Sequence, residues 1–559
     1  MGLVLVSQDH PLVDRCNDVS GGRMGGSEVQ QTIGIHGHLS ANPARSFLST
    51  LEPGMSRPEA LTKLESLSRE CSLLESIDAL LGWDERTMLP EGGGAYRATQ
   101  MKYLAGLIHE KRTSPQFADL LKSLADSDWS VESGSDDAAT VKQWKRKVKR
   151  AQSQPRELVE ELAEATVAGQ QIWVQARKEN SFETFRPALQ RIVKLKQEQA
   201  AAIGFQENAY DALLDEYEPE ATTIEIGKVL NELKSQLVPL IQQLADAPRQ
   251  PDTQHLHAHF PATQQESFAK LAAGKIGFDF DRGRLDVTAH PFCTELGPAD
   301  CRITTRYDED FFNTAFFGVL HEAGHGIYEQ GLRSDRYGLP SGMYCSLGIH
   351  ESQSRLWENL VGRSRGFWEY FLPTAKSSFP EPLSSVSVDD FYQSINAVRP
   401  SLIRVEADEA TYNLHIVIRF ELEQQLISGN LPVEDLPSAW NQAYAEALGV
   451  TVDEDRNGCL QDVHWSAGLF GYFPTYTLGN LYAAQLFEAA EAELGDLDAQ
   501  FAQGVFAPLK GWLQSKIYDF GQNHPAGSLV RMATGAELSS TALMTYLRRK
   551  LLPIYGIST

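Results

Sequence analysis

At 559 residues with a formal net charge of -24, the chain is long enough for a large core, or for two or three subdomains that share one cleft. Hydrophobic residues make up 42% of the chain, which is typical of globular proteins, and no apolar run reaches membrane-spanning length. Acidic residues are spread along the chain and would repel the phosphates of nucleic acid. These features exclude a membrane-spanning or disordered protein and disfavour a nucleic-acid binder, while six scattered cysteines predict reduced thiols and a cytoplasmic protein.

Two regions are predicted from the pattern along the chain. Residues 1–57 are rich in glycine, serine and polar side chains and show little periodicity, so we expect a flexible N-terminal lead. From Pro58 onward, leucines at steps of three and four residues predict a long helix that ends by Pro90, and a second helix that begins near Ala95. Residues 58–559 are therefore expected to form a helical domain.

Helical spacing with many charges continues from about 115 to 250. We interpret the basic run Lys145–Arg150 as a solvated helix face, because acidic residues flank it. The alternating histidines of His255–His259 are typical of a strand or an extended loop, with metal binding as the alternative.

Short strands are predicted over 278–281, 284–288 and 302–307, where β-forming residues alternate with polar ones. They should form a small sheet beside the helix that follows. After that helix the pattern is helical almost to the end, apart from a glycine- and aromatic-rich loop over 468–476.

The sequence His321-Glu322-Ala323-Gly324-His325 is typical of a zinc hydrolase. Two histidines four positions apart lie on one face of a helix, and Glu322 can act as general base toward a metal-bound water. A third ligand is needed, and we expect Glu351, at the start of the next predicted helix, in preference to its neighbour His350, because two histidines and a glutamate are a known peptidase set. Cobalt or manganese can occupy similar sites. The alternative is a buried helix turn with a salt-bridged Glu322.

The region from about Pro58 to the C-terminus resembles the carboxypeptidase Taq family of metallocarboxypeptidases. Besides the histidine motif, the elements that carry the resemblance, in the family's order, are His290-Pro291-Phe292, Asp300-Cys301-Arg302-Ile303-Thr304, His350-Glu351-Ser352-Gln353, Ile403-Arg404-Val405-Glu406-Ala407-Asp408, and Gly458-Cys459-Leu460-Gln461-Asp462-Val463-His464-Trp465.

The resemblance implies a mainly helical, cleft-bearing peptidase fold related to neurolysin and angiotensin-converting enzyme, with two subdomains flanking a deep cleft and a small sheet beside the metal helix. It also implies a homodimer that removes single residues from peptide C-termini. In this family His321, His325 and Glu351 would hold zinc, and Glu322 would be the base.

An enzyme that accepts only chain ends must recognise a free carboxylate, which a guanidinium does with two parallel hydrogen bonds. Arg404 is the first candidate and Arg302 the second, and Gln461 is a further substrate-binding candidate. Alternatively, Arg404 forms an ion pair within an acidic helix, with Glu406, Asp408 or Glu409 as partner. Arg302 could likewise hold the sheet against the metal helix.

Negative charge that develops on the reacting carbonyl oxygen needs a hydrogen-bond donor, and we expect His464, Tyr472 or Tyr476 to supply it. Asp300, Asp408 or Asp462 could orient a ligand histidine. The sequence thus predicts a zinc-dependent metallocarboxypeptidase of broad specificity that acts on cytosolic peptides. The alternatives are an oligoendopeptidase or dipeptidyl carboxypeptidase with the same metal site, and a non-catalytic zinc-containing peptide-binding protein.

Overall fold

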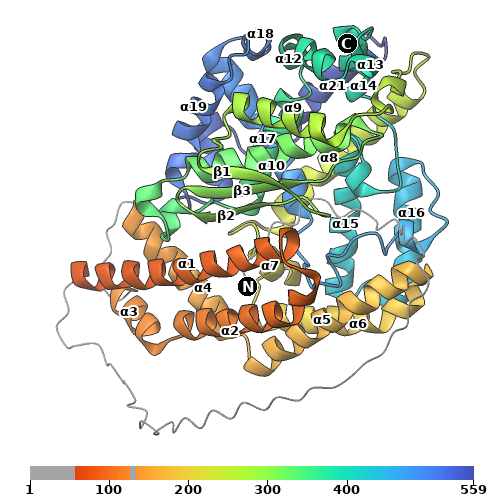
Figure 1. Ribbon diagram of the computed structural model, residues 1–559. Helices are drawn as coiled ribbons and strands as arrows, with labels where there is room; N and C mark the ends of the chain where they lie inside the picture. The colour runs from red at the N-terminus through yellow and green to blue at the C-terminus, as the bar shows by residue number, and fades with distance from the viewer. Residues whose placement is uncertain (1–56, 126–133, 559) are drawn as a thin grey trace, which may run out of the picture.

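The computed structural model describes residues 57–125 and 134–558 (Figure 1). All but the last residue of the expected lead, 1–57, lies outside the described residues, so its flexibility stays a prediction. The mainly helical fold with one small sheet is confirmed.

Nine helices precede the sheet in the described part of the chain. They are α1 (Arg57–Thr87), α2 (Gly94–Arg112), α3 (Pro115–Ala125), α4 (Asp136–Ser153), α5 (Arg156–Glu179), α6 (Phe182–Ile203), α7 (Ala209–Leu214), α8 (Thr223–Ala245) and α9 (Ala262–Ile276). Side-chain caps fix several starts: Ser135 accepts a hydrogen bond from the amide of Ala138, and Thr222 from that of Glu225. The predicted starts near Pro58 and Ala95 are confirmed.

The second half contains α10, the metal helix that carries the motif His321–His325, and its neighbours. The helices are α10 (Phe312–Gly331), α11 (Leu347–Arg355), α12 (Arg365–Ser378), α13 (Pro380–Leu383), α14 (Val388–Ile395), α15 (Thr411–Ser428), α16 (Leu436–Leu448), α17 (Pro474–Leu494), α18 (Leu497–Ala502), α19 (Ala507–Lys516), α20 (Ala526–Thr534) and α21 (Thr541–Ile554). A π-helical turn, Leu356–Val361, continues directly from α11.

The sheet has the order β1-β3-β2, formed by β1 (Gly283–Val287), β2 (Cys293–Gly297) and β3 (Asp300–Thr305). β1 runs parallel to β3, and β2 runs antiparallel to it. The sheet lies beside α10, as expected, and it stands between that helix and α1 (Figure 1). Two of the three predicted strands are confirmed, β2 was not predicted, and the strand over 278–281 is wrong.

The segment 278–281 is a turn because its backbone is held by a side chain and not by a neighbouring strand. Gln330 on α10 accepts a hydrogen bond from the Asp279 amide and donates one to the Asp279 carbonyl. The rings of Phe278 and Phe280 lie 4.9 Å apart, so two apolar residues that would share one face of a strand pack together across a turn.

Two further expectations need correction. The segment around His255 is not a strand but a short 3-10 turn, Gln254–Leu256, followed by irregular chain. The ring centres of His255 and Phe391 lie 6.1 Å apart and those of His257 and Phe311 4.4 Å apart, so aromatic packing accounts for these two histidines. The basic run on α4 is only partly solvated, because Arg146 pairs with Asp215 at 2.9 Å and its neighbour Arg150 with Glu216 at 2.8 Å.

Two hydrophobic clusters form the core of the residues that the structure describes. The larger one extends from Leu158 on α5 to Tyr555 and surrounds the metal helix. The smaller one joins α1, α3 and α4 through Leu64, Phe117 and Trp144, and it is separate from the first. The N-terminal helices therefore pack as a unit with apolar contacts of its own beside the main body (Figure 1).

In the part of the chain that the structure describes, no helix is both long and apolar enough to cross a bilayer. The five described cysteines have free thiols, as predicted.

Candidate metal centre

The metal helix α10 is buried along most of its length, and His321, Glu322 and His325 are each at most 2% exposed. The four-residue spacing brings the two imidazole rings to 4.9 Å from one another on the face that points toward α11. Phe312, Phe316 and Phe317, in the turns that precede the motif, belong to the main apolar cluster, which anchors this helix.

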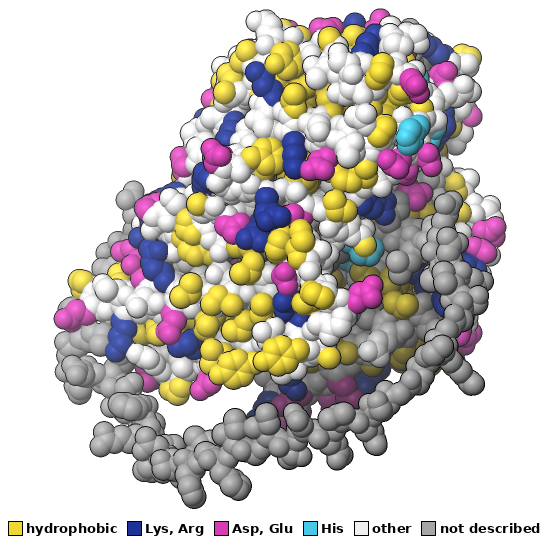
Figure 2. All heavy atoms as spheres, viewed as in Figure 1, with side chains coloured by type: hydrophobic (Ala, Val, Ile, Leu, Met, Phe, Trp, Pro, Cys, Tyr) yellow, Lys and Arg dark blue, Asp and Glu magenta, His cyan; other side chains and the backbone are white. Residues whose placement is uncertain are grey.

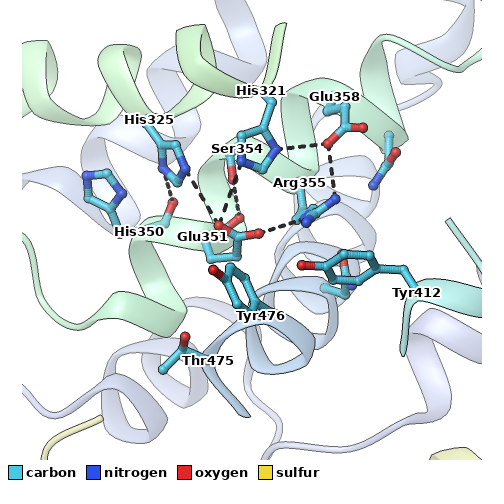
Figure 3. Close-up of polar contacts among 12 residues, drawn as sticks. His321, His325, His350, Glu351, Ser354, Arg355, Glu358, Tyr412, Thr475 and Tyr476 are labelled. Atoms are coloured by element: carbon cyan, nitrogen blue, oxygen red, sulfur yellow. Dashed lines mark hydrogen bonds and ion pairs between the residues drawn. The ribbon is translucent and has the colours of Figure 1, made fainter. Parts of the chain in front are cut away.

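Glu351 on α11 completes the group. Its Oε2 lies 3.8 Å from His321 Nε2 and 3.6 Å from His325 Nε2, and the three side chains point toward one another (Figure 3). Within the described residues this is the one cluster of at least three histidine, cysteine or acidic side chains that is tight enough to hold a metal. The alternative ligand, His350, points elsewhere: its Nε2 lies 2.8 Å from Glu329.

Two glycines allow Glu351 to reach this position. A Cβ on Gly324, inside the histidine motif, would lie 2.6 Å from the Gln353 carbonyl oxygen on α11, and a Cβ on Gly479 of α17 would overlap the Glu351 side chain. Contacts this short cannot form, so α10 and α17 enclose α11 only because both positions lack a side chain.

The residues present fit a zinc ion. Zinc bonds of about 2.0–2.2 Å in tetrahedral geometry place neighbouring ligand atoms about 3.3–3.6 Å apart, close to the observed spacings. The Nε2 atoms of both histidines are buried and have no hydrogen-bond partner in the protein, which suits coordination. Burial, together with His350 and His321, lowers the pKa of His325 well below its usual value. Burial also acts to lower the pKa of His321, but the carboxylates of Glu351 and Glu358 outweigh it and raise that pKa.

The opposite edge of each histidine ring is held by a second contact. Glu358, in the π-helical turn, places Oε2 2.9 Å from His321 Nδ1, and the His350 carbonyl oxygen lies 3.0 Å from His325 Nδ1. Sequence reasoning did not find Glu358. The available signal was its place two turns after Glu351 on one predicted helix, which puts both carboxylates on similar faces.

None of the three aspartates expected to orient a histidine does so. Asp300 pairs with Arg302, Asp408 accepts the first amides of α15, and Asp462 pairs with buried arginines.

Arg355 joins the two carboxylates that flank the histidines. Its Nε lies 2.7 Å from Glu351 Oε1 and its Nη1 3.3 Å from Glu358 Oε2 (Figure 3). Burial alone would raise the pKa of Glu358, but Arg355 and His321 lower it well below the usual range, so this carboxylate stays ionised.

The expected donor residues lie on the other side of Glu351. His464 Nε2 is 3.2 Å from the Tyr476 hydroxyl, the Tyr472 and Tyr476 rings are 5.4 Å apart, and Tyr476 lies next to Glu351 in Figure 3. Tyr476 belongs to α17 and not to the expected loop, because the helix already starts at Pro474. Burial and the nearby Glu351 charge raise the pKa of Tyr472, so its hydroxyl keeps its proton.

Arg404 and Gln461 belong to a buried network. Arg404 is 0% exposed, its Nε donates to Asp462 at 2.9 Å, and its Nη1 donates to the Tyr412 hydroxyl at 3.1 Å. Gln461 Oε1 accepts from the Arg404 amide and from Arg419 Nη2. The expected acidic helix around Arg404 is instead a 3-10 turn, Arg404–Glu406, and the ion-pair partner found here is the distant Asp462.

Arg302 braces the sheet. It forms two 2.8 Å hydrogen bonds to Asp300, and its guanidinium lies 4.2 Å from the ring centre of Trp83 on α1. This placement matches the alternative expectation, in which Arg302 has a structural role. Arg302 contacts α1, however, and not the metal helix.

Two cavities open beside the histidine motif. The first, of about 740 Å³, is lined by His350, Glu329 and residues of α1, α2 and α4. The second, of about 620 Å³, is lined by Glu322, Arg355 and Tyr412 and extends along the first turns of α10.

A helical fold with two histidines, a glutamate and an adjacent acid beside open cavities defines a metallopeptidase. Residues 63–551 match the model of the carboxypeptidase Taq (M32) metallopeptidase family. Thermostable carboxypeptidase 1 of Thermus thermophilus is 45% identical, and the match covers 90% of this chain and all of that protein. Carboxypeptidase 1 of Bacillus subtilis is 39% identical, and the match covers 85% of this chain and 95% of that protein. The crystal structure of the M32 carboxypeptidase from Deinococcus radiodurans superposes on this chain with a TM-score of 0.86 and 39% sequence identity. The match covers 89% of this chain and all of the Deinococcus chain.

The chain belongs to the carboxypeptidase Taq (M32) family, as the sequence motifs predict, and it is a metallocarboxypeptidase.

Proposed function

We propose that this protein is a zinc-dependent carboxypeptidase of broad specificity that releases single C-terminal residues from peptides, with Glu322 as the base. The observation that carries the proposal is the spacing of His321, His325 and Glu351, with Glu322 on the same turn of α10 and at the wall of a cavity.

His321, His325 and Glu351 would hold the metal. When bound, zinc would lower the pKa of a coordinated water toward neutrality and polarise the scissile carbonyl. Glu322 would take the proton from that water at its carboxylate and later deliver it to the leaving amine. Arg355 would hold Glu351 in place through its 2.7 Å bond, and Glu358 would orient the His321 ring.

Tyr472, Tyr476 and His464 would supply donors for the developing negative charge. The support is their position beside Glu351 and the raised pKa of Tyr472, which keeps a proton available at neutral pH. His464 would hold the Tyr476 hydroxyl in place.

Arg404 and Gln461 would act on the substrate through their neighbours. Because Arg404 is fully buried and bonded to Asp462 and Tyr412, we propose that it positions Tyr412, which lines the cavity beside Glu322. Arg302 would keep the sheet against α1.

We also propose a cytoplasmic homodimer that joins through α1 and α2. Exposed apolar residues gather over these helices in the lower part of Figure 2, and they include Leu73, Tyr96 and Tyr103, at 59%, 73% and 71% exposure. Faces of this kind mark protein–protein contacts.

The experiment that tests the function is a time course of products from one defined peptide, with and without a chelator, read by mass spectrometry. A ladder that shortens by one residue from the C-terminus and stops with chelator supports the proposal. Internal cuts would indicate an oligoendopeptidase, and loss of dipeptides a dipeptidyl carboxypeptidase. Metal binding without turnover would indicate a binding protein.

A further inference from the structure

We infer that Arg306 binds the terminal carboxylate of the substrate in the cavity beside Glu322, and so makes the enzyme select chain ends. This inference rests on the proposed function, because it names the residue that reads the substrate of that same site.

The fold brings Arg306 next to the metal helix. It directly follows β3, and the preceding residue, Thr305, has its hydroxyl oxygen 3.8 Å from where a Cβ of Gly318 would lie. Gly318 is one turn before Glu322 on α10, and Arg306, Gly318 and Glu322 all line the 620 Å³ cavity. A residue bound with its scissile carbonyl at Glu322 would therefore extend toward Arg306.

The guanidinium of Arg306 is available for a ligand. In the described part of the chain it forms no hydrogen bond and no ion pair, although it is only partly exposed. Burial lowers its pKa, and the acidic groups that act on it, Asp308 and Glu406, do so without an ion pair. A partly buried guanidinium without a partner costs free energy that a bound carboxylate would recover.

The other arginines at this cavity are engaged or peripheral. Arg355 is bonded to Glu351 and Glu358. Arg363 donates to the Ile395 carbonyl at 2.6 Å and lies 3.7 Å from the ring centre of Phe317. Arg399 is exposed at the rim, where it donates to the Pro251 carbonyl at 3.3 Å. Among the described arginines that line this cavity, only Arg306 has all the N–H donors of its planar guanidinium available for a carboxylate.

A second polar group that lines this cavity also has an atom without a protein partner. Asn313, in the first turn of α10, lines the same cavity, and its Oδ1 is buried without a hydrogen bond to the protein. An acceptor and a guanidinium in one cavity match the amide N–H and the carboxylate of a C-terminal residue.

The experiment compares the Arg306→Ala and Arg306→Gln variants of the full, metal-loaded chain with Arg399→Ala as the matched control. The substrates are one N-acylated tripeptide as the free acid and as the C-terminal amide. We expect both Arg306 variants to raise KM for the acid about ten- to a hundredfold, because charge-assisted hydrogen bonds are lost, and to leave KM for the amide and the metal content unchanged. Arg306→Lys should restore part of the affinity, and Arg399→Ala should behave as wild type.

An unchanged KM for the acid in Arg306→Gln, with the metal bound, would overturn the inference. If one of the three Arg306 variants fails to fold, the ratio of KM for the free acid to KM for the amide in the other two still tests the inference. The binding of the free-acid and amide tripeptides to the Glu322→Gln enzyme, with and without Arg306→Gln, gives a second readout without turnover. A wild-type enzyme that holds metal but cuts neither substrate would instead refute the proposed function, so the two failures differ.

Discussion

Glu358 Oε2 lies 2.9 Å from His321 Nδ1, on the edge of the ring opposite the nitrogen that faces Glu351. A carboxylate in this position fixes the tautomer and the orientation of a ligand histidine. Arg355 contacts both Glu358 and Glu351, so the two carboxylates and the histidine form one connected unit.

Glu358→Gln should lower zinc affinity about ten- to a hundredfold, because the amide holds the His321 ring more weakly than a carboxylate does. Zinc affinity is measured by competition with a chromophoric chelator. Glu488→Gln, an exposed change on α17, is the control and should bind zinc as wild type does. Unchanged affinity in Glu358→Gln would show that the contact does not orient the ligand.

Gly479→Ala should displace Glu351 and empty the metal site, because its new methyl group would overlap the glutamate side chain. We expect a fall in bound zinc with most of the helical signal in circular dichroism retained. Gly511→Ala on α19, where a Cβ meets open space, should change neither property. A fully loaded Gly479→Ala enzyme would contradict the packing argument.

Glu322→Gln should keep the metal and lose peptide hydrolysis by about a hundred- to ten-thousandfold in kcat, because the amide cannot accept the proton. Metal content and turnover are measured on the same sample. Near-wild-type turnover in this variant would refute the mechanism.

Glu423 should make stability depend on pH. Burial raises its pKa to about 7, although Tyr210, the Gly471 amide and Trp465 donate hydrogen bonds to it. The pKa of Glu423 is higher in the folded protein than in the unfolded chain, so the protonated carboxyl contributes to the free energy of unfolding. This contribution is complete below about pH 4.5 and is lost as the pH rises through about 7.

Urea unfolding of wild type and Glu423→Gln at pH 5, 6, 7 and 8 tests this expectation. The free energy of unfolding of wild type should fall by up to about 3 kcal/mol relative to that of the variant between pH 5 and pH 8. The comparison also removes the contribution of Glu218, whose pKa burial likewise raises to about 7 and which both proteins retain. Parallel curves would show that Glu423 does not titrate in this way.

Replacing Leu73 and Tyr103 together with Glu should convert the proposed dimer into a monomer, because two charges would be buried in an apolar interface. Analytical ultracentrifugation measures the mass of wild type and variant. Leu271→Glu, at a 50% exposed position on α9 outside this face, is the control. A wild-type monomer, or a variant that stays dimeric, would contradict the proposed interface.

Several elements were predictable because short-range spacing carries them. The helix period alone puts His321 and His325 on one face, and the strands over β1 and β3 follow from alternation. The same reasoning failed at 278–281, where alternation is present but Gln330, from a distant part of the chain, holds a turn. It also missed β2, which pairs antiparallel with β3 and has an irregular register between Glu295 and Gly297.

The sequence by itself determined the candidate ligand residues, the acid beside them and the family, because those depend on residue identity and order. Only the tertiary structure decided which groups surround them. It placed Glu358 behind His321, buried Arg404 against Asp462, and left Arg306 unpaired at the cavity. These outcomes depend on contacts between residues far apart in the chain, such as Gly479 against Glu351, which no local pattern encodes.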